Sequence, residues 1–132
     1  MLTENRTALD YLASAGVGDR GWLVVCTDGM PKRGMFEMLT RLEGLEQMTV
    51  LIWTDWDLGG LRIAENILRR LPAGLGSLVP HPGLPGRKVE VPEAYLSHAD
   101  QRLKAMAESI SAYGEVYQEE SLSLLGTGAG FL

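Results

Sequence analysis

The sequence has one cysteine, two histidines and no long apolar run, and each scarcity removes a class of protein. Cys26 stands alone in a strand-like stretch, so no disulfide framework is expected. His81 and His98 lack the cysteine or carboxylate spacing of a zinc site. No apolar run approaches the roughly 18 residues needed to cross a bilayer, and no basic-then-apolar leader opens the chain. We therefore expect a cytoplasmic protein without membrane contact.

Positive charge is also scarce, because 12 Lys and Arg face 17 Asp and Glu, giving a net charge of −5. This balance argues against the chain alone gripping a long stretch of DNA through its phosphates. A nucleic-acid role would need local basic residues, a metal or another domain. With 132 residues, 45% of them hydrophobic, the chain is the size of one domain with a real core.

Apolar residues alternate between helical and strand spacing along the first 72 residues. Helical spacing predicts helices over 5–16, 30–44 and 58–71, while two short apolar runs at 21–27 and 48–54 predict strands. Unbroken apolar runs are typical of strands covered on both faces, so we expect both strands to be central and parallel. The order predicts a three-layer α/β fold, with a mostly parallel sheet flanked by helices.

Beyond this part, the residues at 72–92 hold five of the six prolines and predict a loop with one short strand at Ser77–Val79. A polar amphipathic helix is expected over 97–112. The glycine-rich end, 126–132, is predicted to be a flexible tail.

Two carboxylates flank a tryptophan in "TVLIWTDWDLGGLRIAEN", where the second predicted strand ends. In a parallel sheet, ligands bind beyond the carboxyl ends of the strands. Asp55 and Asp57 can share one face there while Trp56 turns away to pack. Two adjacent like charges favour a cation between them, and Mg²⁺ takes such carboxylates. Gly59 and Gly60 would permit a tight turn, and the amides that open the next helix could receive a phosphate.

The same residues allow plainer interpretations. An Asp at the end of a strand often caps the following helix, and a glycine pair often only makes a turn. A D-x-D motif also fits other α/β phosphate chemistry, including aspartyl phosphotransferases, in which the first Asp is the nucleophile.

Glu4 lies directly before the first predicted helix, upstream of both predicted strands. A Glu, then a strand and helix, then a strand ending in D-x-D-x-x-G, resembles the Toprim domain of topoisomerases, bacterial-type primases and several nucleases. The matching residues are Glu4, Asp55, Asp57 and Gly60, within 2–71.

Longer phrases resemble one branch of that group. "TEN-x-T", "VVCTDGMPKRGMFEMLTRL" and "WTDWDLGGLRIAENIL" are similar to the C-terminal Toprim domain of the (JetD-like) nuclease subunit of the Wadjet plasmid-defence system. Its relatives include the topoisomerase VI A subunit. "YQEES" resembles a Q-E motif that closes many of these proteins. The resemblance implies a Toprim-like domain at 1–125, with a core at about 2–80, an extension at 81–125, and a longer parent protein.

The resemblance implies a Mg²⁺ or Mn²⁺ site made by Glu4, Asp55 and Asp57, with Glu4 as ligand or as general base or acid. Further candidates could touch the phosphate or DNA: Gly59, Gly60, Arg62, Lys32 and Arg33. For Arg62 an ion pair with Glu65 on the helix face is the favoured role, and for Lys32 and Arg33 surface solvation is an equal alternative.

Some features depart from the family pattern. Only three residues precede Glu4, so the strand that should present it is almost missing. Asp28 could be another ligand, but a cap of the helix after Pro31 is the favoured role. Glu119 and Glu120 either complete the acidic C-terminal motif or form a solvated charge pair.

The expected function is metal-dependent cleavage of DNA phosphodiesters, in plasmid or phage defence or in topoisomerase-like DNA processing. The alternatives are a non-catalytic interaction module with the Toprim fold and, third, a phosphotransfer α/β domain. Expected partners are DNA held through other domains of the full-length protein, a second copy of the chain, and SMC-like complex subunits.

Overall fold

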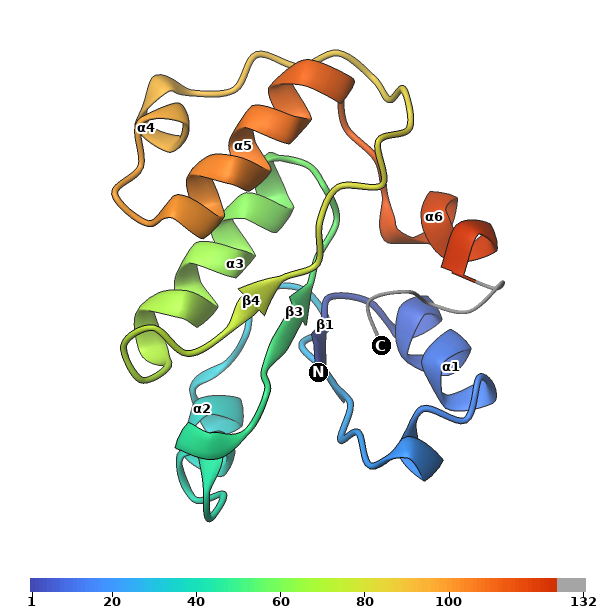
Figure 1. The fold of residues 1–132 in the computed structure, drawn as a ribbon, viewed down its shortest axis with the longest axis vertical. Helices are drawn as coiled ribbons and strands as arrows, with labels where there is room; N and C mark the ends of the chain where they lie inside the picture. Colours follow the sequence, from blue (N-terminus) through green and yellow to red (C-terminus); the bar gives the residue numbers. More distant parts are fainter. Residues whose placement is uncertain (126–132) are drawn as a thin grey trace.

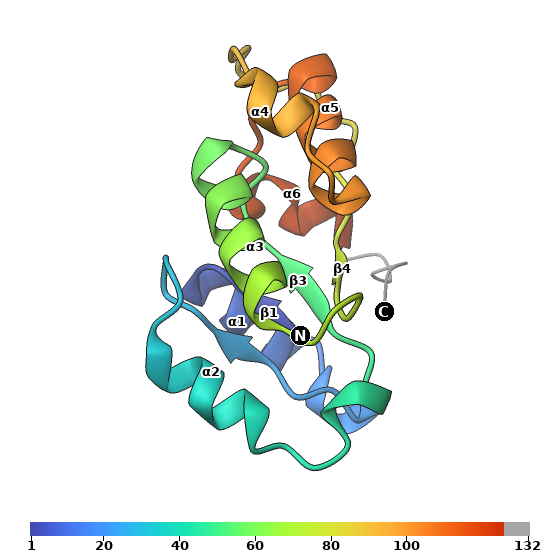
Figure 2. The ribbon, with the colours of Figure 1, turned by 90° about the vertical axis from the view of Figure 1, so that its left-hand side faces the viewer.

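A four-stranded parallel sheet forms the centre of the molecule (Figure 1). The computed structural model describes residues 1–125, and of the last three only the backbone; the predicted flexible tail lies outside this part. The strands run in the order β2-β1-β3-β4. Their bounds are Leu2–Thr3 (β1), Val25–Cys26 (β2), Leu51–Trp53 (β3) and Ser77–Leu78 (β4). Helices lie on both faces, which confirms the three-layer α/β fold (Figure 2).

The three predicted N-terminal helices are all present. They are α1 (Arg6–Ser14), α2 (Arg33–Thr40) and α3 (Leu58–Arg70). Short 3₁₀ turns lie at Gly18–Arg20 and Leu45–Gln47. One face of α3 is buried, as its apolar spacing predicts. This face includes Leu61, Ala64, Ile67 and Leu68. Because β2 and β3 are joined by a crossover past β1, α2 and α3 cover one face and α1 the other (Figures 1 and 2).

The strand that precedes Glu4 is short but central. Leu2 pairs with Val25 on one side and with Ile52 on the other. β2 is therefore an edge strand, and the prediction that it is central is wrong. Its apolar run is instead half-buried, because only one neighbour and the surrounding loops cover it.

The C-terminal part returns to the sheet after a long excursion. Following β4 come α4 (Glu93–Leu96), α5 (Gln101–Tyr113) and α6 (Gln118–Leu125). α5 packs on α3 and β4, and α6 lies beside α1 (Figure 1). Between α5 and α6, Val116 forms an antiparallel bridge with Trp56, just past β3. This bridge brings the start of α6 to the carboxyl end of the sheet.

The helix predicted over 97–112 is displaced by a few residues. Asp100 caps α5 by accepting a hydrogen bond from the Arg102 amide, so the helix begins at Gln101. Throughout the described residues, no helix is both long and apolar enough to pass through a membrane.

Candidate metal centre at the carboxyl end of the sheet

Glu4 and Asp55 meet because they follow neighbouring strands. Glu4 comes directly after β1, and Asp55 lies two residues beyond β3. The backbone amide of Glu4 donates to the Trp53 carbonyl at 3.1 Å. In return, the Asp55 amide donates to Oε2 of Glu4 at 2.7 Å. The predicted pairing of Glu4 with the D-x-D segment is therefore present in the structure.

Asp57 caps the helix that follows. Its Oδ1 accepts a hydrogen bond from the Gly60 amide at 2.7 Å, and α3 begins at the next residue, Leu58. Trp56 turns away as predicted, is 2% exposed and donates through Nε1 to the Val79 carbonyl. The capping role does not displace Asp57 from the site, because its charge still acts on Glu4 and Asp55.

Gly60 is required by a close approach of backbone. A Cβ atom at this position would lie 1.8 Å from the carbonyl oxygen of Asp55, far inside contact distance. Gly59 is more tolerant, since a Cβ there would stand 3.3 Å from Oδ1 of Asp57. Gly60 thus lets the first turn of α3 pack directly onto the carboxylate segment.

Gln118 is a site residue that sequence reasoning did not assign. It is completely buried, and its backbone amide donates to Oδ1 of Asp55 at 2.7 Å. Its side chain bonds to Asn5, Thr3 and the Trp53 carbonyl. The "YQEES" phrase contained the signal, but no local periodicity shows that this glutamine reaches residues more than 60 positions away.

Burial and mutual repulsion favour the protonated forms of the two central carboxyl groups. Burial raises the pKa of Glu4 to about 7, opposed by the bond from the Asp55 amide and reinforced by the charges of Asp55, Asp57 and Glu119. Burial likewise raises the pKa of Asp55 to about 6, and neighbouring acidic charges add to the rise. A cation placed among these groups would reverse both shifts.

The donors at the site are carboxylate oxygens, the ligands that hard divalent cations take. Each carboxylate uses one oxygen on a backbone amide: Glu4 on Asp55, Asp55 on Gln118, Asp57 on Gly60. Within residues 1–125 the second oxygen of each carries no hydrogen bond. Yet no three Asp, Glu, His or Cys side chains in that range stand in an arrangement able to hold a metal ion as placed. Ligation would require the free oxygens to converge by side-chain rotation.

Asp28 does not cap α2, so that prediction is wrong. The N-cap residue of α2 is Lys32, and it makes no side-chain capping bond. Asp28 has a left-handed backbone, with φ of 53°, and its carboxylate pairs with Arg6 at 3.3 Å. The reason is that the turn after β2 folds towards the start of α1, and the Gly29 amide donates to the Glu4 carbonyl.

The basic candidates have partners of their own or lie in solvent. Arg33 pairs with Glu37 at 2.8 Å, one turn along α2, while Lys32 is exposed. Arg62 faces the Tyr95 hydroxyl of α4.

The structure also shows which partners the acidic residues Glu65 and Glu120 have. Glu65 bonds to His98 at 3.0 Å, which replaces the expected pair with Arg62. Glu120 pairs with Arg87 at 3.3 Å, whereas the charge of exposed Glu119 acts on both Glu4 and Asp55.

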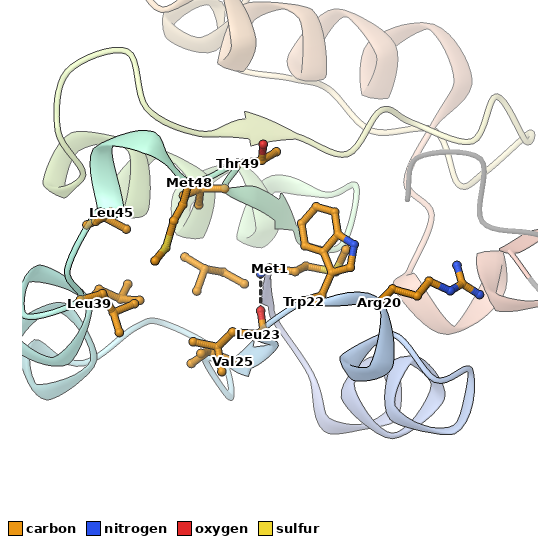
Figure 3. Close-up of a pocket in the computed structure, with 13 residues that line it drawn as sticks. Met1, Arg20, Trp22, Leu23, Val25, Leu39, Leu45, Met48 and Thr49 are labelled. Atoms are coloured by element: carbon orange, nitrogen blue, oxygen red, sulfur yellow. Dashed lines mark hydrogen bonds between the residues drawn. The ribbon is translucent and has the colours of Figure 1, made fainter.

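A hollow lies at the opposite end of the sheet from the carboxylates (Figure 3). It has a volume of about 470 Å³ and is lined mainly by apolar residues, among them Met1, Trp22, Leu39 and Met48. Arg20 lies at its edge, and the terminal amine of Met1 donates to the Leu23 carbonyl at 2.6 Å. Among the described residues that line this hollow there is no carboxylate or histidine, in contrast to the end of the sheet where Glu4 and Asp55 lie.

These observations define an α/β domain with an acidic site where its central parallel strands end. The chain belongs to the family described as "Protein of unknown function C-terminus (DUF2399)", whose model matches residues 1–75. The matched range includes Glu4, Asp55, Asp57 and Gly60, and it ends before Gln118. No curated protein matches the chain.

Proposed function

We propose that this chain is a Toprim-type catalytic domain for divalent-metal-dependent cleavage of DNA, similar to the C-terminal domain of the Wadjet nuclease subunit. The observation that carries the proposal is the convergence of Glu4 and Asp55 through the 2.7 Å bond, with Asp57 at the start of α3. These residues match the Toprim pattern and follow the two central strands, β1 and β3.

Mg²⁺ or Mn²⁺ would be held by the free oxygens of Glu4, Asp55 and Asp57. When bound, the ion would neutralise charge on the scissile phosphate and stabilise the charge that develops as the ester breaks. The chain's own groups orient the reaction. The amides at the start of α3 would present positive dipole towards a phosphate, and Glu4 would hold or take a proton where its free oxygen is not a ligand of the metal.

The net charge of −5 implies that DNA is delivered by other parts of a longer protein or by partners. A second copy of the chain would supply the second site needed to cut both strands. SMC-like subunits are the partners that the Wadjet resemblance suggests. Among the basic candidates, exposed Lys32 is the one best suited to reach the DNA backbone, since Arg33 is paired.

A direct test is nicking of supercoiled plasmid with Mg²⁺ or Mn²⁺, using the full-length parent protein. The native protein should cleave, and Glu4→Gln and Asp55→Asn should each lower the rate by about 100-fold or more, as loss of an electrostatic catalytic group does. Equal rates for the native and substituted proteins would refute the assignment.

A non-catalytic interaction module is the second candidate. It is favoured by one observation: within residues 1–125 no acidic cluster stands ready to hold a metal. Such a module would fold normally and show no divalent-metal affinity at Asp55.

A further inference from the structure

The geometry points to Gln118 as a positioning residue of the acidic site: its side chain ties the segment that carries Glu4 to the segment that carries Asp55. The inference deepens the proposed function and rests on it where metal binding is concerned. Gln118 lies 43 residues past the last residue that the family model matches, 118 against 75. The matched part of the chain therefore does not contain everything that shapes its site.

One end of the tie is the segment around Glu4. The Gln118 amide nitrogen, Nε2, donates to Oγ1 of Thr3 at 3.2 Å, and its Oε1 accepts from Nδ2 of Asn5 at 2.7 Å. Thr3 and Asn5 are the two neighbours of Glu4 in the chain. Asn5 is itself fixed, because its Oδ1 caps α1 by accepting from the Ala8 amide at 2.9 Å.

The other end is the segment that leads from β3 to Asp55. Nε2 of Gln118 also donates to the Trp53 carbonyl at 2.8 Å, and the backbone amide of Gln118 donates to the Asp55 carboxylate. The side chain is completely buried, and Thr3 is 1% exposed, so water cannot substitute for these bonds. The Trp53 carbonyl also accepts a hydrogen bond from the Glu4 amide. The end of β3 is therefore bonded both to Gln118 and to the residue that follows β1.

Only an amide suits this position. Both N–H groups of the Gln118 side chain donate to acceptors, and its oxygen accepts from a donor. A glutamate carboxylate has no N–H to donate, so one of its oxygens would face the Trp53 carbonyl oxygen without a hydrogen bond. The described hydrogen bonds of the side chain go to neither carboxylate, that of Glu4 or that of Asp55. Its effect on the site is therefore to hold their backbones, which identifies it as a positioning residue and not a catalytic one.

The experiment compares Gln118→Met with Ser121→Ala in the ¹⁵N-labelled chain without metal. Methionine keeps the volume but loses every side-chain bond, while the backbone amide of residue 118 remains. Ser121 is 1% exposed in the same helix, and within the described residues its hydroxyl bonds to the Gln118 carbonyl alone, so its substitution matches the burial without removing any bond of the Gln118 side chain. We expect hydrogen exchange of the Asp55 amide to quicken by about tenfold relative to the Ile67 amide in Gln118→Met, but not in Ser121→Ala. Equal Asp55 exchange in the two variants would overturn the inference.

Asn5→Ser provides the same test if Gln118→Met fails to fold, because serine keeps the α1 cap and loses the bond to Gln118. Faster exchange at Asp55 supports the tie, and native exchange overturns it. Mn²⁺ affinity is then measured on the same samples, with about tenfold weakening expected in Gln118→Met. If the native chain binds no Mn²⁺, the proposed function fails, while the exchange result still decides the role of Gln118.

Discussion

The carboxylate of Glu4 accepts a hydrogen bond from the backbone amide of Asp55, 51 residues further along the chain, at 2.7 Å. The geometry of parallel sheets explains the contact, because the residues that follow two adjacent strands emerge at the same edge. The contact occupies one carboxylate oxygen of Glu4 and leaves the other without a hydrogen bond among the described residues. It also places two acidic groups side by side in a half-buried setting, with consequences for stability that can be measured.

Glu4→Gln should stabilise the metal-free protein at pH 8. A glutamine oxygen can still accept from the Asp55 amide, while the repulsion and the burial of charge disappear. After allowance for solvent screening of a partly exposed group, the gain in free energy of unfolding should be on the order of 1 kcal/mol. Urea unfolding measures it. Glu37→Gln, an exposed surface substitution, is the control and should change stability by no more than about 0.5 kcal/mol. A destabilised Glu4→Gln protein would contradict the prediction.

Metal-free stability should fall as the pH rises towards neutrality. The folded-state pKa of Glu4 is raised from 4.5 to about 7, and that of Asp55 from 3.8 to about 6. Folding therefore takes up protons between these values, so the stabilising contribution is complete below about pH 4 and is lost as the pH passes 7. Thermal unfolding from pH 4 to 8 tests this. The difference between the native protein and the Glu4→Gln, Asp55→Asn double variant isolates these two groups, and a difference independent of pH would refute the assignment.

Gly60→Ala should disrupt the domain, whereas Gly34→Ala should not. A Cβ at position 60 would collide with the Asp55 carbonyl at 1.8 Å, so the start of α3 must shift, at a cost of about 3 kcal/mol or more. Gly34 also lies in the first turn of a helix, but nothing approaches its Cβ position within 4 Å. Alanine there should raise stability by about 0.5–1 kcal/mol. Chemical denaturation of the two variants gives the comparison, and similar stabilities would show that the close approach is absent.

The two roles of Asp57 can be separated by substitution. Asp57→Asn keeps an oxygen to cap α3 and removes the charge, so stability should hold while Mn²⁺ affinity falls about tenfold or more. Asp57→Ala should lose both the affinity and about 1 kcal/mol of stability, because the Gly60 amide loses its acceptor. Calorimetric Mn²⁺ titration and urea unfolding measure the two effects. Native affinity in Asp57→Asn would restrict Asp57 to capping.

Local sequence signals predicted α1, α2, α3 and, with shifted bounds, α5, but not α4 or α6. The period of apolar residues fixes α3 because burial of Leu61 and Ile67 determines which side faces the sheet. The grouping of Glu4 with Asp55 came from the Toprim resemblance, and the structure brings the two together because they follow adjacent parallel strands. The order of the strands in the sheet could not be predicted. The apolar run that forms β2 is as apolar as the run that forms β3, and its composition does not indicate that it pairs with a single strand.

Long-range polar contacts were beyond the sequence. Asp28 pairs with Arg6 because of the path taken by the turn after β2, which no local pattern encodes. Gln118 reaches the site only because Val116 pairs with Trp56. The segments that carry Glu4, Asp55 and Asp57 could thus be named from the chain, but Gln118, which bonds to the residues around Glu4 and to the Trp53 carbonyl, could not.

The measurement that tests the central claim most directly is an NMR titration of the ¹⁵N-labelled chain with Mn²⁺, comparing the native sequence with Asp57→Asn. The account predicts selective broadening of the amide signals around Glu4, Asp55 and Asp57 in the native protein, and its loss in the variant. Uniform or absent broadening at those residues, in a protein shown to be folded, would contradict a metal site at the carboxyl end of this sheet.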